Sequence, residues 1–233
     1  MFEGFVLDDV DLEGQRIRVR YGGSGPAVVL LHGHPRAHTT WYAVAPRLVA
    51  AGYTVVCPDL RGYGQSGKPV TGAEHTPYSK RELAADVVRL MTSLGHERFA
   101  VAGHDRGSYV AYRTALDHPE RVSKLVVMDS VPVVEALERC GAEFAAAWWH
   151  WWFFAQQEKP AERVICADPD TWYNAWTTLA LWSTDDDMEQ LYGDVVAVWR
   201  PWCRQVEGHG IKSTHHIAER NPEDLVRSLR ASL

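Results

Sequence analysis

Residues 99–112 read Phe-Ala-Val-Ala-Gly-His-Asp-Arg-Gly-Ser-Tyr-Val-Ala-Tyr, and this stretch decides the fold. Its first part is an apolar run typical of a buried strand, and its last part has the spacing of a helix. Between them, Gly103-His104-Asp105-Arg106-Gly107 has the glycine–x–nucleophile–x–glycine arrangement of a sharp strand-to-helix turn. Glycine at both ends allows a close approach of the backbone that a side chain would prevent. The pattern predicts that Asp105 stands at the tip of this turn.

An aspartate at that tip selects a particular chemistry. A carboxylate with an unperturbed pKa of about 3.9 is already ionised at neutral pH and needs no base to become a nucleophile. It is poorly suited to attack an ester carbonyl, but it can attack a saturated carbon, expel a leaving group and form an alkyl ester with the protein. The alternative is an aspartate that only caps a helix. We favour the nucleophile, because the strand, both glycines and the helix occur together around Asp105.

The composition bounds the class of protein and its partners. The 233 residues suit one α/β domain with a small insertion, and 46% hydrophobic residues suffice for a core. With 24 basic and 30 acidic residues and a net charge of −6, no basic patch favours nucleic acid. Residues 1–14 lack the apolar segment of a signal peptide, and no apolar run has the ~18 residues of a membrane span. Four scattered cysteines indicate reduced thiols in a cytoplasmic protein, without a disulfide framework or a zinc site.

Apolar runs and helical patterns alternate along the first 130 residues. We expect strands at 16–21, 27–31, 53–57, 99–102 and 124–128, and helices at 41–51, 80–94 and after Asp105. Continuous apolar strands alternating with helices predict a mostly parallel, doubly wound α/β sheet.

The character of the sequence changes after residue 130. Residues 131–177 contain no buried-strand run and are rich in aromatic residues, which predicts a short helical cap inserted into the core. Beyond it we expect a strand at 179–182, a helix at 195–204, a strand within 205–211 and a closing helix at 222–233. The predicted organisation is thus an α/β core of 1–130 and 178–233 with the cap at 131–177.

Several motifs together resemble the α/β-hydrolase superfamily over nearly the whole chain, and the resemblance implies its fold. They are His32-Gly33-His34-Pro35, Asp59-Leu60-Arg61-Gly62-Tyr63-Gly64, the 103–107 turn and the late His215. Within that superfamily, the chain looks like the fluoroacetate (haloacetate) dehalogenases with a shortened cap. This second likeness rests on Gly-His-Asp-Arg-Gly, Val127-Met128-Asp129 and His150-Trp151.

The resemblance implies a catalytic triad. Asp105 would displace halide from the carbon beside a substrate carboxylate, and His215 would activate the water that hydrolyses the resulting ester, with His216 as the neighbouring alternative. A histidine suits that step because its pKa of about 6.5 lies near working pH. Its orienting acid would be Asp129, favoured by the dehalogenase pattern, or Asp186, which follows the next predicted strand as in many epoxide hydrolases.

The resemblance also implies substrate contacts. Arg106 would pair with a substrate carboxylate, and its backbone N–H and that of His34 would form an oxyanion hole. His150 and Trp151 would donate N–H groups to the departing halide, although an aromatic core stripe is the alternative for this pair. Tyr109 stands where the dehalogenases carry a second arginine, so a larger or less acidic substrate becomes plausible. Tyr173 or Tyr192 could complete the halide site.

The predicted function is hydrolysis through an aspartyl ester, most simply the dehalogenation of a small 2-haloacid. An epoxide hydrolase and a cap-truncated binding protein without turnover are the alternatives. The expected partners are a small-molecule substrate and water; a homodimer is left open, and neither nucleic acid, membrane, metal nor cofactor is expected. No HExxH or comparable histidine spacing supports a metal site.

Overall fold

The computed structural model describes residues 2–72, 74–156, 158–169, 210–213 and 215–232. By its contacts the chain divides into two units. The first comprises residues 1–130 with 216–233, and the second comprises 131–215. The expected elements at 179–182, 195–204 and, almost entirely, 205–211 lie outside the described residues, as does the predicted end of the cap at 177.

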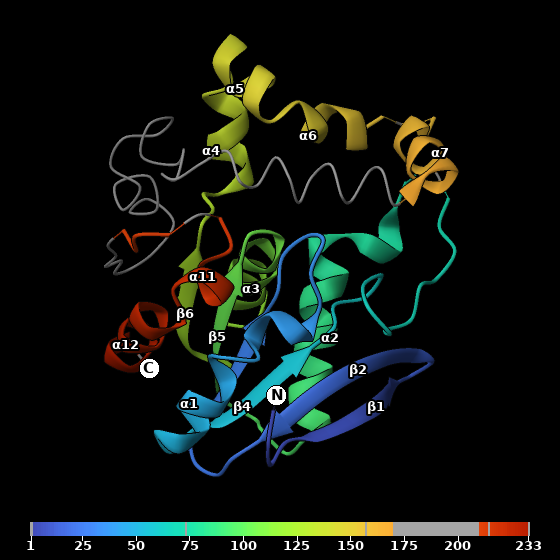
Figure 1. Cartoon of the computed structure of the whole chain (residues 1–233). Helices are drawn as coiled ribbons and strands as arrows, with labels where there is room; N and C mark the ends of the chain where they lie inside the picture. Colours follow the sequence, from blue (N-terminus) through green and yellow to red (C-terminus); the bar gives the residue numbers. More distant parts are fainter. Residues whose placement is uncertain (1, 73, 157, 170–209, 214, 233) are drawn as a thin grey trace. The chain divides into compact units, whose positions relative to one another are not determined.

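A six-stranded sheet forms the centre of the first unit (Figure 1). Its strand order is β1-β2-β4-β3-β5-β6, with parallel pairing from β4 through β3 and β5 to β6 and antiparallel pairing of β1 with β2 and of β2 with β4. The strands are β1 (Val6–Leu12), β2 (Gln15–Gly22), β3 (Ala27–Leu31), β4 (Thr54–Pro58), β5 (Phe99–His104) and β6 (Val122–Met128). The predicted α/β fold with a mostly parallel sheet is confirmed.

The three central strands are buried because helices and loops cover them. Every residue of β3, β4 and β5 is buried, which explains their continuous apolar runs. Along the chain, helical segments of this unit follow or separate the strands: η1 (His38–Trp41), α1 (Ala45–Ala50), η2 (Thr76–Tyr78), α2 (Lys80–Ser93), α3 (Arg106–Asp117), α11 (Ile217–Arg220) and α12 (Pro222–Ser232). The core they enclose is aliphatic and includes Val29, Leu31, Val101 and Val110.

Two details differ from the sequence prediction. The single helix expected at 41–51 is a 3₁₀ turn followed by α1, which begins at Ala45 with Pro46 in its first turn, where proline is favoured. Strand β1 was not expected, because its sequence carries three aspartates. It is a largely exposed edge strand paired with β2, so its acidic side chains need no burial.

The second unit is helical in its described part, as the aromatic composition of 131–177 predicted. Its helices are α4 (Val133–Glu138), α5 (Ala142–Ala147), α6 (Trp149–Phe154) and α7 (Pro160–Ala167). Val131, Ala136 and Phe144 form its small core, with Trp148 and Trp151 packed against it. Cys57, Cys140 and Cys166, the cysteines among the described residues, are free thiols. No helix in the described ranges is both long and apolar enough to cross a bilayer.

Candidate active site

Asp105 stands at the turn between β5 and α3 in a backbone conformation that side chains rarely adopt. Its φ of 51° and ψ of −121° are strained for any residue other than glycine. Hydrogen bonds hold the turn on both sides: the Asp105 N–H donates to Met128 O (3.0 Å), and its carbonyl accepts from Ser108 N (3.0 Å). The buried Ser108 hydroxyl donates to Gly103 O (2.6 Å) and accepts from Met128 N (3.1 Å). The tip is therefore built into the sheet.

Three glycines leave the space that this turn needs. A Cβ on Gly103 would come closer than 3.0 Å to the Gly107 backbone, and a Cβ on Gly107 would do the same to Leu31 O. A Cβ on Gly33 would meet the side chain of Asp105 itself. Each overlap is closer than real Cβ atoms tolerate, so the glycine spacing in the sequence reports tight packing around the turn.

The loop after β3 places a backbone donor on the Asp105 carboxylate. The His34 N–H donates to Asp105 Oδ1 over 2.7 Å, and both residues are half-buried. The His34 ring lies in contact with Tyr63, whose hydroxyl is 3.5 Å from His34 Nδ1. One carboxylate oxygen of Asp105 is therefore positioned by the main chain, and the oxyanion role of His34 stays a prediction.

Arg106 lies beside Asp105 and Tyr63. Burial alone would lower the pKa of its guanidinium, but the electrostatic effects of Tyr63 and Asp105 and a hydrogen bond donated to the Tyr63 oxygen outweigh burial and raise it. Arg106 is therefore a permanent positive charge next to Asp105. Tyr109 is 6% exposed and packs with its ring centroid 6.3 Å from that of Tyr112. Its predicted contact with substrate stays a prediction.

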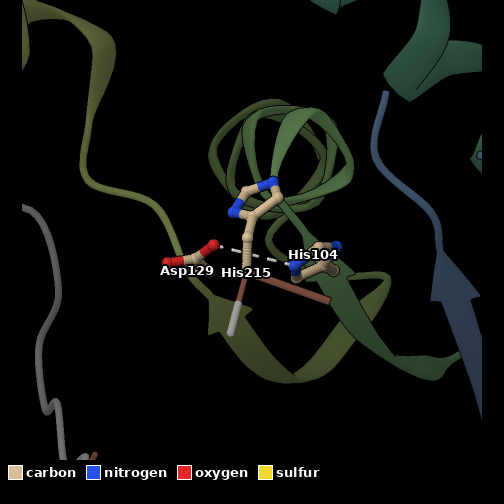
Figure 2. A group of neighbouring side chains, drawn as sticks. All are labelled: His104, Asp129 and His215. Carbon is tan, nitrogen blue, oxygen red and sulfur yellow. Dashed lines mark ion pairs between the residues drawn. The ribbon is translucent and has the colours of Figure 1, made fainter. Parts of the chain in front are cut away.

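Asp129 follows β6 and faces His104, the residue before Asp105 (Figure 2). His104 Nε2 lies 3.8 Å from Asp129 Oδ2, and both side chains are buried. Asp129 also has a positive φ, of 52°. Figure 2 draws His215, the last residue of the second unit, with this pair. Its role as base and that of Asp129 as orienting acid stay predictions. These three residues are also of types that bind metal ions.

His216, the alternative base, precedes α11 and lies near His104, with ring centroids 6.4 Å apart. Burial and the positive charge of Arg36 lower its pKa to about 4, while Asp105 acts in the opposite direction. His216 is therefore neutral at pH 7 and resists taking up a proton.

His32 and Asp59 form a buried polar network beside the site. His32 is 0% exposed, donates from Nδ1 to Gly33 O (2.8 Å) and accepts at Nε2 from Leu60 N (3.0 Å). Burial lowers its pKa to about 4, so it stays neutral in this arrangement. Asp59 Oδ1 accepts from both the backbone N–H and Nδ1 of His38 (2.7 Å each). This network shapes the loops that carry Gly33 and His34.

His150 and Trp151 belong to the aromatic cluster of the second unit. The His150 ring stacks on Trp148 with centroids 6.1 Å apart, and the Trp151 ring meets Phe144 edge-on at 5.8 Å. Trp151 thus has the packing role that the alternative assigned to it, and halide binding by the pair stays a prediction. Asp186, Tyr173 and Tyr192 lie outside the described residues.

Three residues that the sequence did not single out lie near Asp105. Tyr63 contacts Arg106 and His34, His104 pairs with Asp129, and the ammonium of Lys80 lies within electrostatic range of both Asp105 and Arg106. Tyr63 and His104 occur inside motifs that the sequence already marked, so a signal existed for them. Lys80 begins a different helix, and no spacing marks it.

Comparison with known proteins shows the family of the chain. Residues 26–171 match the family described by the alpha/beta hydrolase fold. A fluoroacetate dehalogenase from Burkholderia sp is 50% identical over 173 residues, which are 74% of this chain and 57% of that protein. A soluble epoxide hydrolase from Corynebacterium sp. (strain C12) is 41% identical over 121 residues, 52% of this chain and 40% of that protein. The chain thus matches less than two thirds of the length of either relative.

Solved structures match over a larger share. A protein from Nostoc sp PCC 7120, provisionally described as an α/β hydrolase, superposes with a TM-score of 0.91 at 31% identity, covering 100% of this chain and 99% of that one. A Pseudomonas aeruginosa protein, provisionally described as an epoxide hydrolase, gives 0.85 at 31% identity, with 98% and 95% covered.

Proposed function

The chain belongs to the α/β-hydrolase fold family, and within it we propose a hydrolase that works through an ester on Asp105 and acts on a small 2-haloacid. The likeness to the Burkholderia fluoroacetate dehalogenase supports the substrate class. The aspartate at the strained turn supports the intermediate.

The observation that carries this proposal is the hydrogen bond from His34 N–H to Asp105 Oδ1. A serine enzyme aims its oxyanion donors at the substrate carbonyl. In an aspartyl ester, the carbonyl that water attacks is that of the aspartate itself, so the negative charge develops on its own oxygen. A backbone N–H that already donates to Oδ1 is placed to stabilise the negative charge that develops on this oxygen.

The first step is displacement at carbon. Oδ2 of Asp105 forms a bond to the carbon beside the substrate carboxylate, and halide leaves with the electron pair of the carbon–halogen bond. Arg106, charged at any working pH, pairs with the substrate carboxylate and holds that carbon in line. His150 and Trp151 donate N–H groups to the departing halide in this scheme.

The second step is hydrolysis of the ester. His215 takes a proton from water as the water oxygen attacks Cγ of Asp105, and the bond between Cγ and the alkylated oxygen then breaks. The leaving oxygen takes the proton from His215 and departs as the hydroxyl of a 2-hydroxy acid, and the new carboxyl group loses its proton to solvent, which restores the carboxylate. Asp129 stabilises the protonated base. His216 is the weaker choice, because burial and Arg36 oppose a positive charge on its ring.

The test is intact-mass spectrometry of His215→Ala with chloroacetate, fluoroacetate and a set of epoxides, beside halide release by the parent protein. The proposal expects halide release by the parent and, with the variant, a stable added mass that peptide mapping places on Asp105. His216→Ala is the matched control and should not accumulate the adduct. An adduct from epoxides alone, with diol formation, would assign an epoxide hydrolase. Ligand binding with no adduct and no turnover would assign a binding protein.

A further inference from the structure

A lysine on a neighbouring helix lies close to the proposed nucleophile. Lys80 is the first residue of α2, which packs along α3 (Figure 1). The residue is half-buried. Its ammonium experiences the charges of Arg106 and Asp105, and no hydrogen bond adds to these effects. Neither a hydrogen bond nor an ion pair holds Lys80 to another described residue. A half-buried ammonium without such a partner is costly to the fold, which favours a role in binding.

The neighbouring arginines, in contrast, have carboxylate partners. Arg61 donates to Asp86 through Nε (2.8 Å) and Nη2 (2.7 Å), and Arg89 also donates to Asp86 (2.7 Å). Arg81 pairs with Asp117 at 3.5 Å. The other titratable side chains close to Lys80 in sequence are Tyr78, whose raised pKa keeps it neutral, and Glu82, whose charge acts on Arg61.

Two charged side chains act on Lys80, Asp105 with a negative charge and Arg106 with a positive one. Among these three residues, two positive charges face one negative charge. Burial and repulsion by Arg106 lower the pKa of Lys80 to about 8, and Asp105 offsets only part of this. Lys80 is therefore still mostly protonated at pH 7, and a bound anion would balance its charge.

The position of Lys80 offers a replacement for the second arginine, which this sequence lacks at Tyr109. Tyr109 occupies the position where the dehalogenases that the sequence resembles carry another cation, and it is buried and uncharged. A cation on α2 reaches the same two residues, Asp105 and Arg106, from a different element.

We propose that Lys80 supplies the second positive charge which, with Arg106, binds the anionic group of the substrate, so that the site selects carboxylate-bearing substrates. This inference rests on the proposed function, since it assumes that substrate reacts at Asp105. Arg106 fixes the carboxylate by its planar pair of donors, and Lys80 adds a point charge that is lost in alkali.

The experiment separates charge recognition from turnover. Halide release is measured with chloroacetate and with its neutral analogue chloroacetamide, and binding of glycolate, an unreactive carboxylate, is measured by calorimetry. The proteins are the parent, Lys80→Gln, Lys80→Arg and Lys124→Gln, which removes an exposed lysine of β6 as a matched control.

We expect Lys80→Gln to raise the KM for chloroacetate and the Kd for glycolate about tenfold, the usual effect of losing one charge-assisted contact. Its kcat/KM for chloroacetamide should change less than twofold. Lys80→Arg should restore carboxylate binding, and Lys124→Gln should match the parent. Glycolate binding by the parent should weaken above pH 8, and in Lys80→Arg it should not.

Three results would overturn the role of Lys80. Lys80→Gln could lose the same activity with both substrates, or lose none with either. Lys80→Arg could fail to restore carboxylate binding while the pH profile of the parent stays flat. Failure of the proposed function looks different: the parent would release no halide from either compound. The glycolate measurements would then still decide whether Lys80 binds a carboxylate, and no binding of glycolate to the parent would overturn it.

Discussion

Asp59 and Asp105 occupy equivalent positions in the fold. Each follows a buried parallel strand directly, and each accepts a backbone N–H from the segment after β3, Asp59 from His38 at the start of η1 and Asp105 from His34. Each has a glycine beside it where a Cβ would overlap the carboxylate, Gly64 for Asp59 and Gly33 for Asp105.

The two aspartates differ in what surrounds the carboxylate. Asp59 is 1% exposed, and its oxygens also accept from His38 Nδ1 and Gln65 N. Burial alone would raise the pKa of Asp59, but these hydrogen bonds outweigh it and lower the pKa. Asp105 is half-buried and stands on a backbone with a positive φ. A carboxylate enclosed by donors stabilises loops, whereas one presented by strained backbone is available to react.

The largest expected effect comes from Asp105→Asn. Removing the negative charge removes the nucleophile, so halide release should fall at least about a thousandfold. The midpoint of urea unfolding should shift little, because an amide oxygen can still accept from His34 N. Asp117→Asn, at the half-buried last residue of α3, is the control. A variant as active as the parent would mean that Asp105 is not the nucleophile.

Asp59→Ala should instead destabilise the fold. It leaves the His38 and Gln65 donors without their acceptor in a buried place, which costs about 4 kcal/mol in unfolding free energy. Urea denaturation measures this, with Asp8→Ala on the exposed edge strand as control. The fraction that remains folded should keep its kcat. A variant that is stable but inactive would show that Asp59 serves activity and not stability, contrary to the difference drawn between the two aspartates.

A smaller effect is expected from acid. The pKa of His32 is about 4 in the folded protein and 6.5 when unfolded, so the unfolded chain binds more protons between these values. Stability should be full above pH 6.5 and fall by about 3 kcal/mol from this group as the pH drops to 4. Urea unfolding of the parent and of His32→Gln at several pH values measures the difference in slope. Identical slopes would show that His32 does not resist protonation.

The sequence predicted the elements whose signal is local. Buried runs such as 27–31 became β3 with the same bounds, and the 103–107 motif placed Asp105 at a strained turn. The edge strand β1 was missed because its pairing with β2, and not its own apolar content, stabilises it. Packing between distant elements decides such cases.

The candidate site divides in the same way. Asp105, Arg106 and His34 lie inside motifs, and the structure brings them together. Lys80 reaches them through the packing of α2 on α3, for which no residue spacing exists. His216 could be judged as a base only once its burial and the nearby Arg36 were known.

The bond from His34 to Asp105 has a consequence for where oxygen atoms go. If one carboxylate oxygen stays with the backbone donor and the other joins carbon, the hydroxyl oxygen of the first product molecule comes from the protein, and water replaces it in the side chain. Each protein molecule would thus transfer one of its own carboxylate oxygens to the first substrate molecule. From the second cycle on, the transferred oxygen would come from solvent.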